Sequence, residues 1–450
     1  MKMKIKPPTL LFLHVLLAAS ARSLAAGEPL TLAGAMQRAR ESAREVAAAR
    51  SRHEAAQARA RQASAFRLPS VNLTELYTRT GNPAEVFAMK LNQGVFSFPE
   101  FVATDPNKPA PINAGITRAE ITLPLFTGGE LSGRIEQARD AADAAAGTAD
   151  WASQNAALAA AEAYVQLAQA EEYVRLLSKS RETVGAHVEF ARNHVEQGML
   201  VKSELLRAEV ELSRIDDLVT EAEGRVRVAN ANLAFRLHAA GDASWALAPL
   251  PDPLPLEEPV DSWLATADGR ADLVSARKLL AAGELEEKVK RAPYWPKLAL
   301  VARGELYGDA PFRSSGTSGS IAAVATWNVF QGGADRAAAV AARADARAAR
   351  EDVLQFADGA RLEVRQGFEE ARTARDRHET AKKALAAARE AERITDERFR
   401  SGIVRTLDLL DASTSRREAE TRELVTRAEA HAAAFRLAVR AGRRPESVLP

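Results

Sequence analysis

The sequence contains no cysteine among its 450 residues. Disulfide bonds, zinc–thiolate sites and a lipid anchor on an N-terminal cysteine are therefore excluded. Long apolar runs are also missing. The run at residues 10–19 is too short to cross a bilayer, because a spanning helix needs about 20 apolar residues. If a membrane holds this protein, strands must provide the attachment.

Neither sign of charge is in excess. The chain has 61 Lys and Arg against 60 Asp and Glu, a net charge of +1. Both signs are interleaved, so nucleic acid is not an expected partner. Basic stretches such as residues 336–350 alternate with alanine at helical spacing. They are expected to form a solvated helix face.

Residues that support catalysis or metal binding are scattered along the chain. His187 and His194, for example, are seven residues apart, roughly 10 Å along a helix, too far to share one metal ion. There is no nucleophile elbow, phosphate-binding loop or dinucleotide-binding motif. The sequence therefore predicts no enzyme, no catalytic residues, no metal and no cofactor.

The N-terminus has the pattern of an export signal. Three lysines in residues 1–6 precede the apolar run, and small residues around 23–26 provide a cleavage site. We expect residues 1–26 to be a signal peptide. An exported chain without a spanning helix is periplasmic, secreted, or inserted in the outer membrane through strands.

The middle of the sequence contains a long-range duplication. Phe-Thr-Gly-Gly at residues 126–129 returns as Phe-Gln-Gly-Gly at 330–333, 204 residues later. Gln-Gly-Met at 197–199 returns as Ser-Gly-Ile at 401–403, at the same displacement. Each proline-free stretch between these markers could form a helix spanning roughly 100 Å. A repeat kept without insertion over this distance predicts a rod whose length matters.

The first repeat is expected to cover residues 27–240 and a proline-rich linker residues 241–261. Its elements are a helix at 31–66, a strand at 71–77, a long loop at 81–112, a strand at 113–124, a long helix to Gly198 and a return helix to about 237. Such a loop could cap an outer mouth or fold into the periplasm.

The second repeat is expected to cover residues 262–442, followed by a short tail at 443–450. It has a helix at 262–291, a strand, a Gly/Ser turn at 314–320, another strand, a long helix to Gly402 and a return helix to about 440. Before the strands, the two repeats correspond at a displacement of 227 residues: Pro69 matches Pro296.

The strands suggest a membrane and an oligomer. Along 298–307, apolar and polar side chains alternate, as expected with lipid on one face and water on the other. Four strands per chain cannot close a barrel, and unpaired edges in hydrocarbon cost several kcal/mol per group. The chain should therefore share a barrel with copies of itself. Three copies would supply twelve strands, although the sequence alone does not set the number.

Over residues 30–442 the chain resembles the TolC-like outer-membrane efflux proteins. The resemblance rests on the duplicated layout, Pro-Leu-Phe-Thr-Gly-Gly at 124–129, Leu-Pro-Ser-Val at 68–71 and the two tip glycines. It implies a mainly α fold with a small β part, assembled as a homotrimer. Twelve strands would form an outer-membrane β-barrel, and the duplicated helical hairpins would continue it as a periplasmic α-barrel.

The resemblance also implies a function and partners. We expect a passive outer-membrane exit duct of a tripartite efflux or type I secretion system, working with a periplasmic adaptor and an inner-membrane pump. Outer-membrane lipid would surround the strands. Drugs, metals and proteins all remain open as cargo. The alternative is a periplasmic adaptor or structural coiled-coil protein that bridges envelope partners without a pore.

The resemblance also places acidic residues at a periplasmic entrance. Asp408 and Asp411 are three residues apart, so both carboxylates face one side of a helix. Read alone, they are solvated acids that the dipole of a helix start favours; in a ring of three copies they would favour cations. Glu204, the counterpart of Asp408, would add to this charge or pair with Arg405. Arg207, the counterpart of Asp411, suggests an ion pair within the ring that holds the entrance closed, so Arg207 and Arg405 are the expected latch residues.

The two hairpin tips combine a glycine with apolar residues. Exposed apolar tips suggest a docking surface, and the resemblance implies that the adaptor binds there. The alternative is a helical turn whose Leu and Val side chains pack inward. The tip residues are Gly198, Met199 and Leu200 in the first repeat, and Gly402, Ile403 and Val404 in the second.

Overall fold

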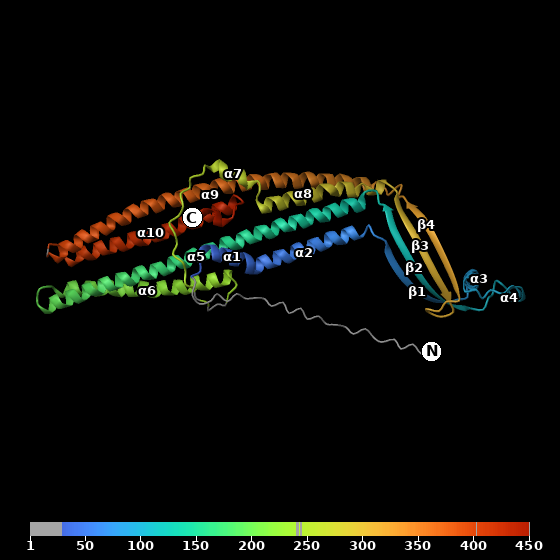
Figure 1. Ribbon diagram of the computed structural model, residues 1–450, viewed down its shortest axis with the longest axis horizontal. Coiled ribbons are helices and arrows are strands. Elements are labelled where there is room, and N and C mark those ends of the chain that lie inside the picture. The colour runs from blue at the N-terminus through green and yellow to red at the C-terminus, as the bar shows by residue number, and fades with distance from the viewer. Residues whose placement is uncertain (1–28, 240–242, 244, 402, 450) are drawn as a thin grey trace.

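Two long helical hairpins and a four-stranded sheet make up most of the chain (Figure 1). The computed structural model describes residues 29–239, 243, 245–401 and 403–449. The predicted signal peptide and Gly402 lie outside this range. The first hairpin consists of α5 (Glu130–Glu196) and α6 (Lys202–Arg236), and the second of α9 (Ala334–Arg400) and α10 (Thr406–Arg440). All four helices begin and end at positions 204 residues apart, so the predicted duplication of the hairpins is confirmed.

Glycines define the helix starts and the first tip. Gly129 and Gly333 precede α5 and α9 with φ angles of 91° and 84°, a left-handed conformation that glycine adopts without strain. Gly198 has a φ of 71° at the first tip. Between these points no proline interrupts either 67-residue helix. The Phe-x-Gly-Gly turns therefore fix where each rod begins.

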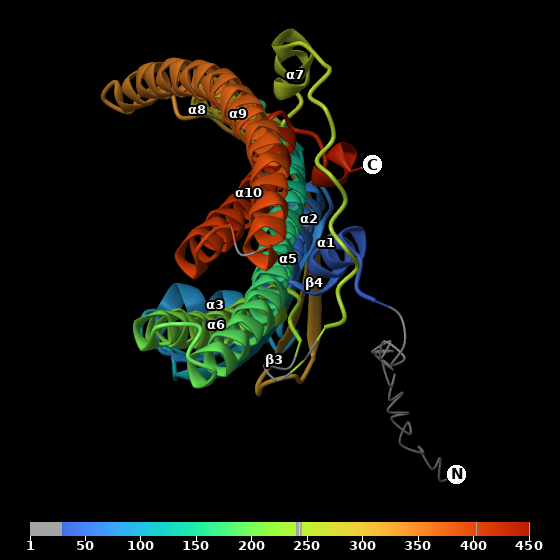
Figure 2. The ribbon, with the colours of Figure 1, turned by 90° about the vertical axis from the view of Figure 1, so that its left-hand side faces the viewer.

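Each helix that precedes the strands is divided into two. The predicted helix at 31–66 consists of α1 (Leu32–Ser42) and α2 (Arg44–Ala65), separated at Ala43, whose backbone is extended. The predicted helix at 262–291 consists of α7 (Val260–Ala267) and α8 (Ala271–Lys290), separated by residues 268–270. Both expectations of one continuous helix were wrong. After these breaks, α1 packs on α5 and α7 packs on α9, both near the linker (Figure 2).

The strands form one antiparallel sheet in the order β1-β2-β3-β4. Their bounds are Ser70–Thr80, Ile112–Phe126, Lys297–Gly308 and Gly316–Thr326. Strands β2 and β3 join the two repeats, with Gly115 opposite Gly308. The predicted Gly/Ser turn at 314–320 was wrong in its second half, because residues 316–320 pair with β3. Pairing with β3 stabilises these residues as a strand although Gly and Ser have a low strand propensity.

The predicted loop at 81–112 was also wrong, because it contains two short helices. These are α3 (Pro83–Asn92) and α4 (Phe98–Ala103). Two of the prolines that suggested a loop, Pro83 and Pro99, lie in the first turn of these helices, where a missing N–H does no harm. Both helices lie at the end of the sheet that is farthest from the hairpins (Figure 1).

The buried core lies where the linker crosses the helices. Tyr164 on α5 is fully buried, and its hydroxyl donates to the carbonyl oxygens of Leu30 and Ala248, both at 2.8 Å. Burial raises the pKa of Tyr164 to about 12, so the hydroxyl keeps its proton. Figure 2 shows the hairpins as an arc, with the linker on its convex side. Among the described residues, no helix is long and apolar enough to cross a membrane.

Candidate functional site

Both hairpin tips lie at the end of the molecule opposite the sheet (Figure 1). In the first tip, the N–H of Met199 donates to the carbonyl of His194 at 2.8 Å; in the second, Ile403 donates to Arg398 at 2.9 Å. The two tips therefore close in the same way. The side chains of Met199 and Ile403 are exposed, whereas Leu200 and Val404 are half-buried.

Asp408 caps the start of α10. Its Oδ2 accepts a hydrogen bond from the backbone N–H of Arg405 at 3.0 Å, and the Arg405 guanidinium lies 3.9 Å from the same oxygen. Such a cap supplies an acceptor to an N–H that the helix leaves free. Asp411, one turn later, is exposed. Within one chain, these two acids thus have the arrangement expected of acids near a helix start.

The first repeat carries the same types of charge in the opposite order. Glu204 lies in the first turn of α6, and its Oε1 is 3.7 Å from a guanidinium nitrogen of Arg207. The structure thus brings each predicted latch arginine to an acid of its own helix, Arg207 to Glu204 and Arg405 to Asp408. A latch between copies stays a prediction.

The spacing of the predicted entrance acids relates them to residues further along α10. Val425 and Glu429 of α10 line grooves with Gln166 of α5. Asp411 precedes Val425 by two heptads, and Asp408 precedes Glu429 by three. In closely packed long helices, residues at heptad spacing keep the same face. We therefore expect the tip acids to share the face of α10 that lines these grooves.

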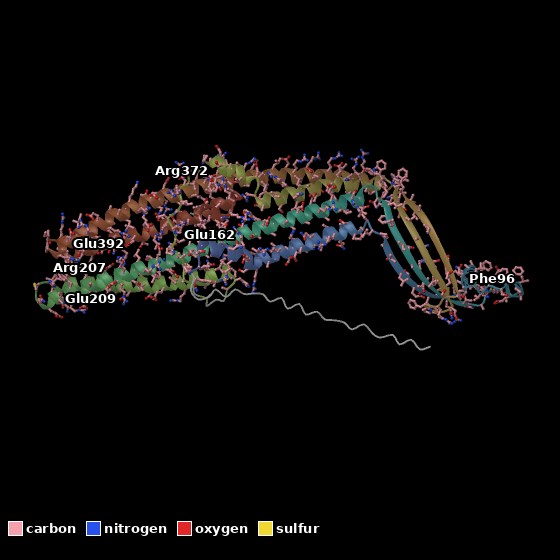
Figure 3. All side chains as sticks on the ribbon, viewed as in Figure 1. Phe96, Glu162, Arg207, Glu209, Arg372 and Glu392 are labelled. Atoms are coloured by element: carbon pink, nitrogen blue, oxygen red, sulfur yellow. The ribbon has the colours of Figure 1, made fainter. Side chains whose placement is uncertain are left out.

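The sequence did not predict the ion pairs that join the two hairpins. Arg417 on α10 donates to Glu211 on α6 at 2.9 Å, and Arg436 donates to Glu162 on α5 at 2.6 Å. Figure 3 labels Glu162 where α5 runs beside α10. In the sequence these residues look like any solvated Arg and Glu on a helix, and only the pairing of distant helices distinguishes them.

Two buried histidines lie under the linker. His431 on α10 shares a 2.8 Å hydrogen bond with the carbonyl of Pro251, and burial lowers its pKa. His378 on α9 lies 3.8 Å from a carboxylate oxygen of Glu423; burial lowers its pKa as well, and Glu423 opposes the shift. Within the described ranges, no three His, Asp or Glu side chains are arranged to hold a metal ion.

The sequence matches the family model described as "Outer membrane efflux protein" over residues 35–237 and 265–443. The chain belongs to this family. It is thus an outer-membrane efflux duct whose helical part lies in the periplasm, and it is a conduit rather than an enzyme. No curated protein sequence matches the chain.

Solved membrane proteins share the fold of the chain. A membrane protein from Pseudomonas aeruginosa is 18% identical with a TM-score of 0.77, and the match covers 91% of this chain and 92% of that one. The outer membrane protein VceC from Vibrio cholerae is 18% identical with a TM-score of 0.74, covering 92% and 96%. The open state of the MtrE outer membrane channel from Neisseria gonorrhoeae is 19% identical with a TM-score of 0.71, covering 92% and 90%.

Proposed function

We propose that three copies of this efflux protein form a passive exit duct with a twelve-stranded barrel and a helical tube. The duct receives cargo from a periplasmic adaptor and an inner-membrane pump, in a tripartite efflux or type I secretion system. Family membership favours this function over the alternative of a bridging adaptor without a pore.

The observation that carries the proposal is a difference in exposure between equivalent helices. Leu410 and Val439 on α10 are 8% and 3% exposed. Their counterparts on α6, Leu206 and Phe235, are 50% and 72% exposed. Apolar side chains at matching positions are covered in the second repeat and uncovered in the first. Helix α6 therefore lacks a neighbour that α10 has.

The duplication indicates which helix this neighbour is. Within the chain, α10 and α8 of the second repeat both pack against α5 of the first. The equivalent contact between two copies exchanges the roles of the repeats. The counterparts of α10 and α8 are α6 and α2, and the counterpart of α5 is α9. We therefore expect α6 and α2 of one copy to pack against α9 of the next. Every copy presents both surfaces, so copies related in this way build a ring when the rotation between neighbours closes.

The sheet edges support the same arrangement. Strands β1 and β4 are the two edges, and most of their residues are exposed. Pairing β1 of one copy with β4 of the next satisfies both rows of backbone groups, which lipid cannot do. Four strands per copy give twelve in a trimer, enough for an open lumen.

The tips supply the entrance and the docking surface. Three copies bring Asp408, Asp411 and Glu204 into rings at the narrow end, where carboxylates attract cations. Arg207 and Arg405 stand next to these acids and provide the latch. The exposed Met199 and Ile403 provide apolar contacts for the adaptor.

Engineered cysteine pairs test the ring, because the chain has no native cysteine. Thr148 of α5 and Ser275 of α8 have hydroxyl oxygens 3.0 Å apart within one chain. Their counterparts are Asp352 of α9, at a displacement of 204, and Ala48 of α2, at 227. Both counterparts are exposed.

We expect Ala48→Cys/Asp352→Cys to give covalent dimers and trimers on oxidation, seen by denaturing electrophoresis without reductant. The matched pair Thr148→Cys/Ser275→Cys should form its disulfide within the chain and leave the apparent mass unchanged. If the intrachain pair forms and the Ala48/Asp352 pair gives only monomers, the proposed ring is wrong.

A further inference from the structure

The segment between β1 and β2 forms a small folded unit, the distal lobe (residues 83–103). It contains α3 and α4 and lies beyond the end of the sheet, where Figure 3 labels Phe96. The Asn82 side chain accepts from the N–H of Ala84 at 3.1 Å and caps α3. The sequence therefore encodes a defined structure here.

The distal lobe has its own aromatic core. The ring centroids of Phe87, Phe96 and Phe101 lie 5.3, 5.4 and 5.8 Å apart, distances typical of aromatic pairs. Lys90 on α3 pairs with Glu100 on α4 at 2.8 Å. These contacts hold the two helices together.

The distal lobe is also fixed to the sheet. Gln93, which is buried, donates from Nε2 to the carbonyl of Asn113 on β2 at 3.0 Å and to that of Gly308 on β3 at 2.8 Å. The carbonyl oxygen of Asn92 lies so close to Gly316 on β4 that a Cβ there would be 1.8 Å away. Three strands thus set the orientation of the lobe.

One face of the distal lobe is apolar and uncovered. Phe98 and Val102 are four residues apart on α4, and they are 68% and 69% exposed. Leu91 and Val95 are exposed as well. Covering apolar side chains of this kind removes them from water and is favourable. A face of this composition therefore favours contact with another apolar surface over water.

The position of the lobe identifies that surface. In Figure 2, α3 lies on the side toward which the arc of hairpins opens, opposite the linker. In the proposed ring, this is the side of the central axis, away from surrounding lipid. The apolar surface that each copy meets at the axis is the same face of the other copies.

We propose that the three distal lobes meet at the axis through Phe98 and Val102 and close the outer mouth of the duct. This inference rests on the proposed trimeric ring and adds a second barrier to it. The entrance at the tips is acidic, whereas the barrier at the exit is apolar, so the two ends respond to different perturbations. The lobes must separate before cargo is released.

A single cysteine tests the contact. Val102→Cys should link two copies on oxidation. Three copies bring three thiols together and a disulfide uses two of them, so at most about two thirds of the chains can be linked. Leu73→Cys on β1 is the matched control, because Leu73 is 72% exposed but lies on the sheet. It should run as a monomer on denaturing electrophoresis without reductant.

Planar-bilayer recordings of the same variants supply the functional result. Oxidation should abolish openings of Val102→Cys pores, and a reductant should restore them, with no change for Leu73→Cys. If Val102→Cys links no better than Leu73→Cys while Ala48→Cys/Asp352→Cys still gives trimers, the exit barrier is wrong and the duct stands. If that pair also fails, the proposed ring itself is wrong.

Discussion

Replacing Arg417 tests how firmly the two hairpins of one chain are held together on the tip side of the linker. Arg417 belongs to α10 and its partner Glu211 to α6, so the pair links the second repeat to the first. The two side chains are only 9% and 17% exposed. A pair in this position must break if the hairpins separate to widen the tube.

The size of the effect follows from burial. Exposed ion pairs contribute about 0–1 kcal/mol. Removing one partner of a buried pair costs about 3–5 kcal/mol. Arg214 lies 3.9 Å from Glu211 and offers a second, weaker partner. We therefore expect Arg417→Gln to cost about 2 kcal/mol, between the two cases.

If the substitution destabilises the closed arrangement by about 2 kcal/mol and leaves the separated arrangement unchanged, the ratio of separated to closed hairpins rises about 30-fold. Single-channel recording should show this as a higher open probability. Arg393→Gln is the control, because Arg393 is exposed and pairs with Glu390 and Glu397 of its own helix. Equal open probabilities for the two variants would refute the reasoning.

Three further predictions concern the entrance, the core and pH. Asp408→Asn/Asp411→Asn should lower cation selectivity in reversal-potential measurements without changing the number of pores; unchanged selectivity would remove both acids from the pore. Tyr164→Phe removes the side-chain donor to the carbonyl of Ala248, whereas the carbonyl of Leu30 keeps the N–H of Ala248 at 3.0 Å, so denaturant unfolding should show a loss of about 1 kcal/mol; a change near zero would count against this role of the hydroxyl. Burial lowers the pKa of His378 and of His431, so as the pH falls below about 6.5 the unfolded chain binds protons first and the free energy of unfolding decreases. His378→Gln/His431→Gln should flatten this dependence between pH 7.5 and pH 5.5, and an unchanged slope would exclude these histidines as its cause.

The hairpins could be predicted because backbone geometry decides them. The glycines of the Phe-x-Gly-Gly turns need positive φ angles, and each long helix begins directly after them. The 68 residues between the markers contain no proline, so no proline ends either helix early. The strand at 298–307 was visible for a similar reason, because its alternation has a period of two.

Tertiary contacts explain what the sequence did not show. Residues 316–320 are strand because β3 pairs with them, although Gly and Ser alone favour a turn. Helices α3 and α4 depend on a small phenylalanine core and on Gln93, which bonds to two strands. Ion pairs such as Arg417 with Glu211 join residues 206 positions apart. No local pattern in the sequence records such a partner.

The central claim, that copies of this chain form a duct, is tested most directly by single-channel conductance of the purified wild-type oligomer in a planar bilayer. The account predicts discrete, cation-selective current steps from a detergent-purified oligomer. A protein that stays in solution without detergent and produces no steps at any concentration would contradict the account and favour a bridging protein without a pore.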